Sequence, residues 1–237
     1  MMNVLLQALG GISGGKVLDV ATGEGDFIKT LVGNLKSYVE IVGIDIIGYT
    51  KVVESIFYAE NVWFMQMDTE WLGFGEESFN TVSISNALHH LENIPRCVGE
   101  IKRVLKSGGH LIIREGYRDT QTEPQLTDMY IHHWVAEIDT AGGYTHNRTS
   151  SRQELVDFVE GLGLCNVVFY DIFNTDLDPM DEAAIKENEG TIDRYIQYAA
   201  GLPCYKTLRQ RGEELQRQLR RVGIQWEPEL IIVGEKQ

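Results

Sequence analysis

Cysteine and long apolar stretches are both scarce in this chain of 237 residues. The three cysteines, Cys97, Cys165 and Cys204, lie far apart and form no Cys-x-x-Cys pair, which argues against a disulfide framework or a zinc knuckle and indicates a reducing compartment. No uninterrupted apolar stretch approaches the ~20 residues of a membrane span, and no cationic segment precedes the first apolar residues. We therefore expect a cytoplasmic protein with no membrane partner.

Basic residues are also few relative to acidic ones. Lysine and arginine total 21 against 35 aspartates and glutamates, a formal net charge of −14. Proteins that bind nucleic acids need a basic surface to displace counterions from phosphates, so we expect no nucleic-acid partner. The composition does not indicate an oligomeric state.

Proline is rare as well, with 5 residues against 24 glycines, so glycine is used for tight turns and not as part of a disordered Pro/Gly mixture. Short apolar runs alternate with segments of helical period, which predicts a parallel sheet with crossover helices. Strands are expected at 16–22, 40–46, 62–68, 79–86, 109–115, 164–173 and 229–234, and helices at about 26–35, 50–60, 95–106 and 150–162. Pro95 suits the first turn of its helix, and Ser107-Gly108-Gly109 is expected to end it.

Two segments, 116–149 and 175–228, interrupt this alternation. Long connections beyond strand ends often cover ligands, so we expect one domain over 1–237 in which both insertions form a substrate cover. The second insertion is acidic over 176–193 and basic over 206–221. This pattern favours two helices whose charged faces solvate each other, with a site for an anionic substrate as the alternative.

The most informative motif is VLDVATGEGDF at 17–27, an apolar strand that contains Asp19 and leads into Gly23-x-Gly25 at the start of a helix. Glycine is needed where a ligand touches the backbone, because a Cβ atom would hold the ligand away. Three features accompany it at later strand ends: Asp45, Asp68 and the run Asn86-Ala87-Leu88-His89-His90. A carboxylate such as Asp45 can accept both hydroxyls of a vicinal diol.

With these motifs, the sequence over roughly 16–115 resembles the class I S-adenosylmethionine-dependent methyltransferases, in the branch of ubiquinone/menaquinone-type and other small-molecule enzymes. The resemblance rests on VLDVATGEGDF, GIDI, MDTEWLGF, SFNTVSISNALHHL and VLKSGGHLIIRE. It implies an α/β, Rossmann-like seven-stranded sheet with an antiparallel last strand, and helices on both faces. It also implies S-adenosyl-L-methionine as cofactor and methyl transfer to a small-molecule acceptor.

In the family pattern, Asp19 and the turn over 21–25 face the methionine moiety, and the acid matching Asp45 takes the ribose hydroxyls. The acid matching Asp68 faces the adenine amino group, and the stretch matching Asn86 to His90 lies beside the sulfonium. The implied cofactor-binding set is Asp19, Ala21, Gly23, Gly25, Asp26, Phe27, Asp45, Ile46, Asp68, Thr69, Asn86, Ala87 and His90. Ala21 departs from the glycine usual in the family, and we expect slightly altered packing there without loss of binding.

Other interpretations of these residues stay open. Asp19 could order its turn, Asp45 could cap a helix and Asp68 could be a solvated loop acid. An NAD-dependent oxidoreductase would need a small residue where Ile28 stands, and a non-catalytic S-adenosylmethionine-binding module is a further alternative. No metal site is expected, because adjacent histidines such as His89-His90 and His132-His133 point apart.

The first insertion supplies the candidate catalytic residues. A helix over 125–140 would turn the stripe Ile131, Trp134, Val135 and Ile138 inward. Tyr130, His133 and Glu137 then share one flank, and Asp128, His132 and Asp139 share the other. The sequence alone does not determine which flank faces a pocket. We expect the first flank to orient the acceptor, with His133 as the proton acceptor and with Tyr117 and His146 as the next candidates. The methylated atom stays undetermined, and methyl transfer requires a general base only for some acceptors.

Overall fold

The computed structural model describes residues 2–48, 61–119, 122–173 and 177–237. The chain divides into two compact units. The first comprises Met1–Glu115, Val156–Ile172 and Leu230–Gln237, and the second comprises Gly116–Leu155 and Phe173–Glu229. The second unit is thus assembled from the two segments that interrupt the strand–helix alternation of the sequence.

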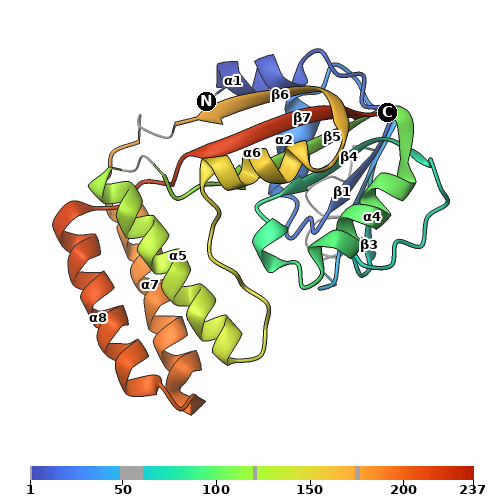
Figure 1. The fold of residues 1–237 in the computed structure, drawn as a ribbon. Helices are drawn as coiled ribbons and strands as arrows, with labels where there is room; N and C mark the ends of the chain where they lie inside the picture. Colours follow the sequence, from blue (N-terminus) through green and yellow to red (C-terminus); the bar gives the residue numbers. More distant parts are fainter. Residues whose placement is uncertain (1, 49–60, 120–121, 174–176) are drawn as a thin grey trace. The chain divides into compact units, whose positions relative to one another are not determined.

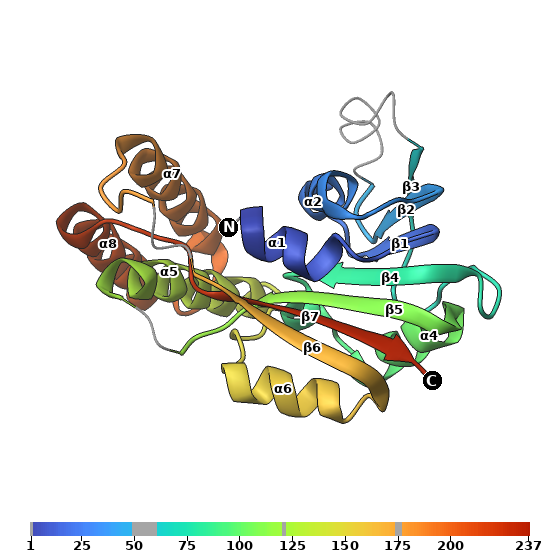
Figure 2. The same cartoon turned by 90° about the horizontal axis from the view of Figure 1, so that it is seen from above.

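The first unit contains a seven-stranded sheet in the order β3-β2-β1-β4-β5-β7-β6, which Figure 2 shows from above. The strands are β1 (Lys16–Val20), β2 (Glu40–Asp45), β3 (Val62–Gln66), β4 (Phe79–Ser85), β5 (Leu105–Gly116), β6 (Leu164–Ile172) and β7 (Glu229–Lys236). The strand pairs β1–β2, β1–β4, β2–β3 and β4–β5 are parallel, whereas β7 runs the opposite way (Figure 1). The predicted Rossmann-like sheet is therefore confirmed.

Helices cover both faces of this sheet (Figure 2). They are α1 (Met2–Leu9), α2 (Asp26–Asn34), the short η1 (Leu88–His90), α4 (Ile94–Val104) and α6 (Arg152–Glu160), whose first residues belong to the second unit. Leu9 of α1 and Ile28 of α2 pack in one core cluster with Ile41, Ile112 and Ile231 of the strands. Helix α1 was not predicted, and the helix expected at 50–60 lies outside the described residues.

Helix α4 begins as predicted but ends earlier. The Asn93 side chain accepts a hydrogen bond from the backbone N–H of Arg96, and Pro95 lies in the first turn. The predicted stop at Ser107–Gly109 is wrong, because α4 ends at Val104 and β5 begins at the next residue. The pairing of β5 with β4 shifts register between Phe79 and Thr81, so the two glycines lie in an irregular part of a strand.

The second unit is built around three helices, α5 (Glu123–Ala141), α7 (Glu182–Tyr198) and α8 (Tyr205–Val222), with η2 (Ala199–Gly201) between the last two (Figure 1). Ile131, Trp134 and Ile138 are buried together with apolar residues of α7 and α8, as the predicted stripe requires. The Trp134 indole N–H donates to the carbonyl of Leu208 at 2.9 Å. None of the helices described is both long and apolar enough to cross a membrane.

The acidic and basic parts of the second insertion form α7 and α8, and their charges pair. Arg220 of α8 contacts Glu182 and Glu189 of α7, and Gln216 donates to Asp193 at 2.8 Å. These contacts support the interpretation of two helices that solvate each other's charged faces. Asp176, at the start of the acidic run, lies outside the described residues.

Candidate functional site

The turn that follows β1 adopts an unusual backbone conformation. Ala21, Gly23 and Gly25 have φ values of 54°, 52° and 85°, all in the left-handed region. Glycine adopts this region readily, whereas an L side chain costs about 1–2 kcal/mol there. The departure at Ala21 thus introduces backbone strain, in addition to the small change in packing that the sequence suggested.

Helix α2 begins directly after this turn, with Gly25 as its N-cap. Asp26 is exposed and its carboxylate lies 2.6 Å from Lys29 Nζ, while Phe27 is buried in the core of the first unit. Two of the predicted cofactor residues therefore have structural roles in this structure: one pairs with a lysine and the other anchors the helix to the sheet.

Asp19 is the buried acid of the site. Its carboxylate accepts hydrogen bonds at 2.6 Å from the Thr22 hydroxyl and at 2.6 Å from the Ser83 hydroxyl. Strand β4 lies beside β1 with Ser83 opposite Asp19, so the sheet itself sets the second contact. Burial raises the pKa of Asp19 to about 6, the two hydroxyl donors oppose the shift, and the nearby Asp45 charge adds to it.

Asp45 ends β2, the strand next to β1. One carboxylate oxygen accepts the backbone N–H of Gly23 at 2.9 Å, and the other accepts the N–H of Ile47 at 2.9 Å. The side chain of Ile46, another predicted cofactor contact, is exposed. Asp45 thus ties the glycine turn to the end of β2, and the helix that it would cap in the alternative interpretation lies outside the described residues.

Asp68 and Thr69 follow β3, which ends at Gln66. Asp68 is exposed and its carboxylate accepts the backbone N–H of Glu70 at 2.9 Å, which fixes the local turn. A solvated loop acid and an adenine contact are both compatible with this geometry. Asp68 and Thr69 therefore stay predictions as cofactor residues.

The stretch after β4 is held by a buried glutamate that the sequence analysis did not select. Glu115 at the end of β5 accepts the backbone N–H groups of Ala87 and Leu88, both at 2.7 Å. Its other oxygen lies 3.1 Å from Nδ1 of His89. Asn86 has a φ of 47°, in the left-handed region, and is exposed, as is His90. A single carboxylate thus fixes the backbone of the predicted cofactor segment.

Taken together, the carboxyl edge of the sheet in the first unit carries acids at successive strand ends. Asp19 is near the end of β1, Asp45 ends β2 and Asp68 follows β3. Open acceptor positions on Asp45 suit hydroxyl donors, and the buried carboxylate of Asp19 gains most from a cationic partner. This arrangement fits a ligand that carries both a vicinal diol and positive charge.

The predicted acceptor flank of α5 lies in the second unit beside a cavity of about 450 Å³. Tyr130 and His133 both line it, together with Met129, Arg148, Arg211, Glu214, Leu215 and Gln218. His133 Nε2 lies 2.9 Å from the hydroxyl of Thr149. The structure therefore brings two of the three flank residues to one cavity that has apolar and cationic walls.

The other three catalytic candidates are placed differently. Glu137 is exposed and pairs with Arg211 at 2.5 Å, so it touches the cavity only through that arginine. Tyr117 is buried and its backbone N–H donates to the carbonyl of Pro228 at 2.9 Å. His146 is buried against Asp139 and His132, on the opposite flank of α5.

Sequence reasoning missed Ser83, Thr22 and Glu115 as parts of the site. Ser83 could have been found only with the strand order, because its contact depends on β4 lying next to β1. Thr22 lies three residues from Asp19, a spacing that a turn can close, which was a usable signal. Glu115 stands at the end of the last motif, directly after the apolar run 111–113 and Arg114, and an acid at such a strand end was a second usable signal.

Comparison with known proteins supports the motif assignment. Residues 18–113 match a family model described as a methyltransferase domain. The chain is 32% identical over 156 residues to a ubiquinone/menaquinone biosynthesis C-methyltransferase UbiE of Geobacter sp. (strain M21), covering 63% of this chain and 65% of the relative. It is 29% identical over 163 residues to a demethylmenaquinone methyltransferase of Porphyromonas gingivalis, covering 62% and 66%. The chain thus matches slightly less than two thirds of the length of these relatives.

Solved structures show the same fold. The YcgJ protein from Bacillus subtilis superimposes with a TM-score of 0.61 at 19% identity, covering 100% of this chain and 99% of that one. The [4+2]-cyclase SpnF superimposes with a TM-score of 0.58 at 14% identity, covering 99% and 79%. Since a cyclase shares the architecture, the fold by itself does not determine the reaction.

Proposed function

Because residues 18–113 match the methyltransferase-domain family, we propose that this protein transfers the methyl group of S-adenosyl-L-methionine to a small-molecule acceptor. The observation that carries the proposal is the buried carboxylate of Asp19. Burial, with the neighbouring Asp45 charge, raises the pKa of Asp19 to about 6 against the effect of its two hydroxyl donors, so the ionised carboxylate gains from a cationic partner. S-adenosylmethionine supplies positive charge at its sulfonium and amino groups.

Asp45 supports the same ligand from the neighbouring strand. Each carboxylate oxygen has more than one acceptor position, so Asp45 can keep its backbone contacts with Gly23 and Ile47 while accepting two ribose hydroxyls. The acid would then hold the glycine turn and the nucleoside at once. Asp68 is our candidate for the adenine amino group, and Asn86 to His90 for the surroundings of the sulfonium.

The main task of the protein in methyl transfer is to position the two reactants. A lone pair of the acceptor attacks the methyl carbon in line with the carbon–sulfur bond, that bond breaks with its electrons going to sulfur, and S-adenosylhomocysteine leaves. Holding the two reactants in line and excluding water accounts for most of the rate enhancement in such a step. A general base is needed only where the attacking atom must lose a proton.

For the acceptor we propose the cavity of the second unit, with the two insertions acting as a substrate cover. Met129 and Leu215 offer apolar surface, and Tyr130 and His133 offer polar contacts within the same cavity. His133 is the candidate proton acceptor, because histidine is the side chain that most often serves as a general base. Protection of both insertions from limited proteolysis by S-adenosylhomocysteine is the result that a closing cover predicts.

Calorimetric titration with S-adenosylmethionine, S-adenosylhomocysteine and NAD tests the cofactor assignment. We expect saturable binding of the first two and none of NAD. In Asp45→Asn, loss of a charge-assisted acceptor for the diol should weaken binding of S-adenosylhomocysteine at least about tenfold. Glu40→Gln is the matched control, since Glu40 stands at the opposite end of the same strand and pairs with Lys16. Equal affinity in Asp45→Asn and wild type would refute the ribose assignment.

Catalysis requires a second experiment, in which candidate acceptors are screened with a labelled methyl donor. Turnover would distinguish the enzyme from a non-catalytic module that only binds the cofactor. Loss of turnover in His133→Ala with unchanged cofactor affinity is the expected result. Normal turnover in this variant would redirect the search to His146 and Tyr117.

A further inference from the structure

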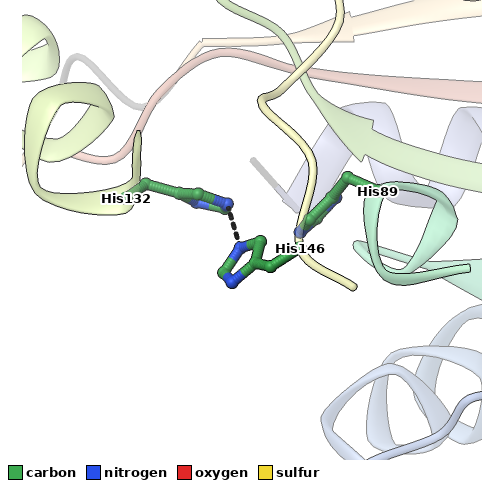
Figure 3. Close-up of side chains that lie close together, drawn as sticks. All are labelled: His89, His132 and His146. Carbon is green, nitrogen blue, oxygen red and sulfur yellow. Dashed lines mark hydrogen bonds between the residues drawn. The ribbon is translucent and has the colours of Figure 1, made fainter. Parts of the chain in front are cut away.

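Three side chains of the second unit form a chain of contacts on the flank of α5 opposite the one that carries Tyr130 and His133. The carboxylate of Asp139 accepts a hydrogen bond from Nδ1–H of His146 at 2.7 Å. Nε2 of His146 lies 3.0 Å from Nε2 of His132, with the two rings facing each other through these nitrogens (Figure 3). His146 is buried and His132 half-buried.

The local fold explains how residues from a helix and a loop come together. His132 and Asp139 are seven residues apart on α5, which places them on the same face of the helix. The chain then reverses: Gly143 has a φ of 94°, and the backbone N–H of Tyr144 donates to the carbonyl of Asp139 at 2.9 Å. This turn brings His146 back against α5, where Thr140 Oγ1 donates to its carbonyl at 3.1 Å.

The 3.0 Å contact requires either a shared proton or a metal ion between the two Nε2 atoms. Donation from Nδ1 to Asp139 favours the tautomer of His146 that has a lone pair on Nε2. If His132 also presents a lone pair at 3.0 Å, the two repel each other unless a cation lies between them. A neutral His132 that carries its proton on Nε2 instead makes a hydrogen bond to His146, so the contact is explained by a shared proton or by a metal ion.

We propose that His132 and His146 are ligands of a divalent transition-metal ion such as Zn²⁺, and that Asp139 orients His146 for this role. Metal-bound histidines characteristically donate their other ring nitrogen to a carboxylate, which is the contact that Asp139 provides. Two imidazole nitrogens on one tetrahedral zinc at ~2.0–2.1 Å lie about 3.3 Å apart, a few tenths of an ångström more than here. Imidazole ligands suit zinc, copper, nickel and iron.

Asp139 is itself held in place. The hydroxyl of Tyr195 donates to the same carboxylate oxygen at 3.4 Å, from α7. Burial raises the pKa of Tyr195 to about 12, with the Asp139 charge adding to the shift, so this phenol stays a neutral donor. The two protein ligands leave coordination positions for water or for a donor atom of a small molecule. The inference does not depend on methyl transfer, because it concerns metal affinity alone.

The test is calorimetric titration of the metal-stripped protein with Zn²⁺ at neutral pH. We expect one saturable site per chain whose affinity falls at least tenfold in His132→Ala and in His146→Ala. Asp139→Asn should weaken binding by about 10–100-fold, as loss of an orienting carboxylate does elsewhere. His133→Ala is the matched control, because it removes the adjacent histidine of the same helix, and its affinity should equal that of the wild type.

Circular dichroism of each variant shows whether the helical unit remains folded, and the partly exposed His132 keeps the test valid if His146→Ala does not fold. Absence of saturable Zn²⁺ binding by the wild type would overturn the proposal and leave a proton between the two imidazoles. Wild-type affinity in a folded His132→Ala would overturn it too, since the metal would then be bound elsewhere.

Discussion

The two units of this molecule differ in how their candidate chemistry is encoded. In the first unit, the acids stand at or near strand ends, so the order and direction of the strands bring Asp19 and Asp45 together at one edge. In the second, Tyr130 and His133 meet Arg211, and His132 meets His146, through helix packing and a reversing loop. Short motifs therefore describe the first site, whereas the second depends on contacts between distant segments.

This contrast predicts that the two units respond differently to substitution. Changes in the first unit should act on the cofactor with little effect on the three-helix unit. Changes in the core of the second should act mainly on its own folding, and should change cofactor affinity only as far as closing of the cover contributes to binding.

The largest expected effect comes from Trp134→Ala. Trp134 is fully buried at the centre of the three-helix core, and loss of a buried tryptophan side chain costs about 3–5 kcal/mol. Thermal unfolding should show a destabilised helical transition, while S-adenosylhomocysteine affinity changes less than twofold. Trp226→Ala, at an exposed tryptophan of the same unit, is the control and should unfold like the wild type. Parallel loss of cofactor binding in Trp134→Ala would show that the units are not energetically separable.

A smaller effect is expected from Glu115→Gln in the first unit. The glutamine offers one acceptor oxygen where the carboxylate serves two backbone N–H groups and the ring of His89, so the free energy of unfolding should fall by about 1–3 kcal/mol. Chemical denaturation measures this. Glu160→Gln, at an exposed acid of α6, should be neutral. Equal stability of the two variants would mean that Glu115 does not hold the segment after β4.

Ala21→Gly should have the smallest effect, and it should be stabilising. Relief of the left-handed strain at φ 54° gains about 1–2 kcal/mol, and the greater freedom of glycine in the unfolded chain offsets about 0.5–1 kcal/mol of that. Ala183→Gly, within helix α7, should be destabilised by about 1 kcal/mol instead. The same sign for both substitutions would contradict the assignment of strain to Ala21.

The sequence predicts the first unit well because its signals are local. Each strand is a short apolar run, and its observed ends differ from the predicted ones by a few residues. Where prediction failed, a tertiary contact decided the outcome: Leu105 pairs with Phe79 of β4, and helix α4 ends at the residue before it. Helix α1 was not predicted, because its eight residues carry no capping signal and their burial depends on packing with α2 and the strands.

The candidate sites show the same limit. Asp19, Asp45 and the glycine turn follow from motifs, but Ser83 becomes a partner of Asp19 only through the strand order. In the second unit, helical periodicity correctly separates the two flanks of α5. Helical periodicity does not predict that His132 contacts His146, because no local sequence pattern indicates the path of the loop that carries His146.

The central claim is that the first unit binds a cationic nucleoside through the buried Asp19. The raised pKa of about 6 fixes the sign of two effects. The folded apo protein binds a proton on Asp19 between the unfolded pKa of 3.8 and about 6, so this group's contribution to stability falls as pH rises through that window. Affinity for a cation follows the opposite trend, because it requires the ionised carboxylate.

The affinity for S-adenosylmethionine, measured by calorimetry between pH 5 and pH 7 in wild type and Asp19→Asn, tests this claim most directly. The asparagine side chain has the size of the aspartate and can form hydrogen bonds in the site, but it does not ionise. The wild-type affinity should fall about tenfold from pH 7 to pH 5, because the ionised fraction of the Asp19 carboxyl falls about tenfold over this range. The Asp19→Asn affinity should be weak and independent of pH. A wild-type affinity that does not change across this range, or an Asp19→Asn variant that binds as tightly as the wild type, would contradict the account.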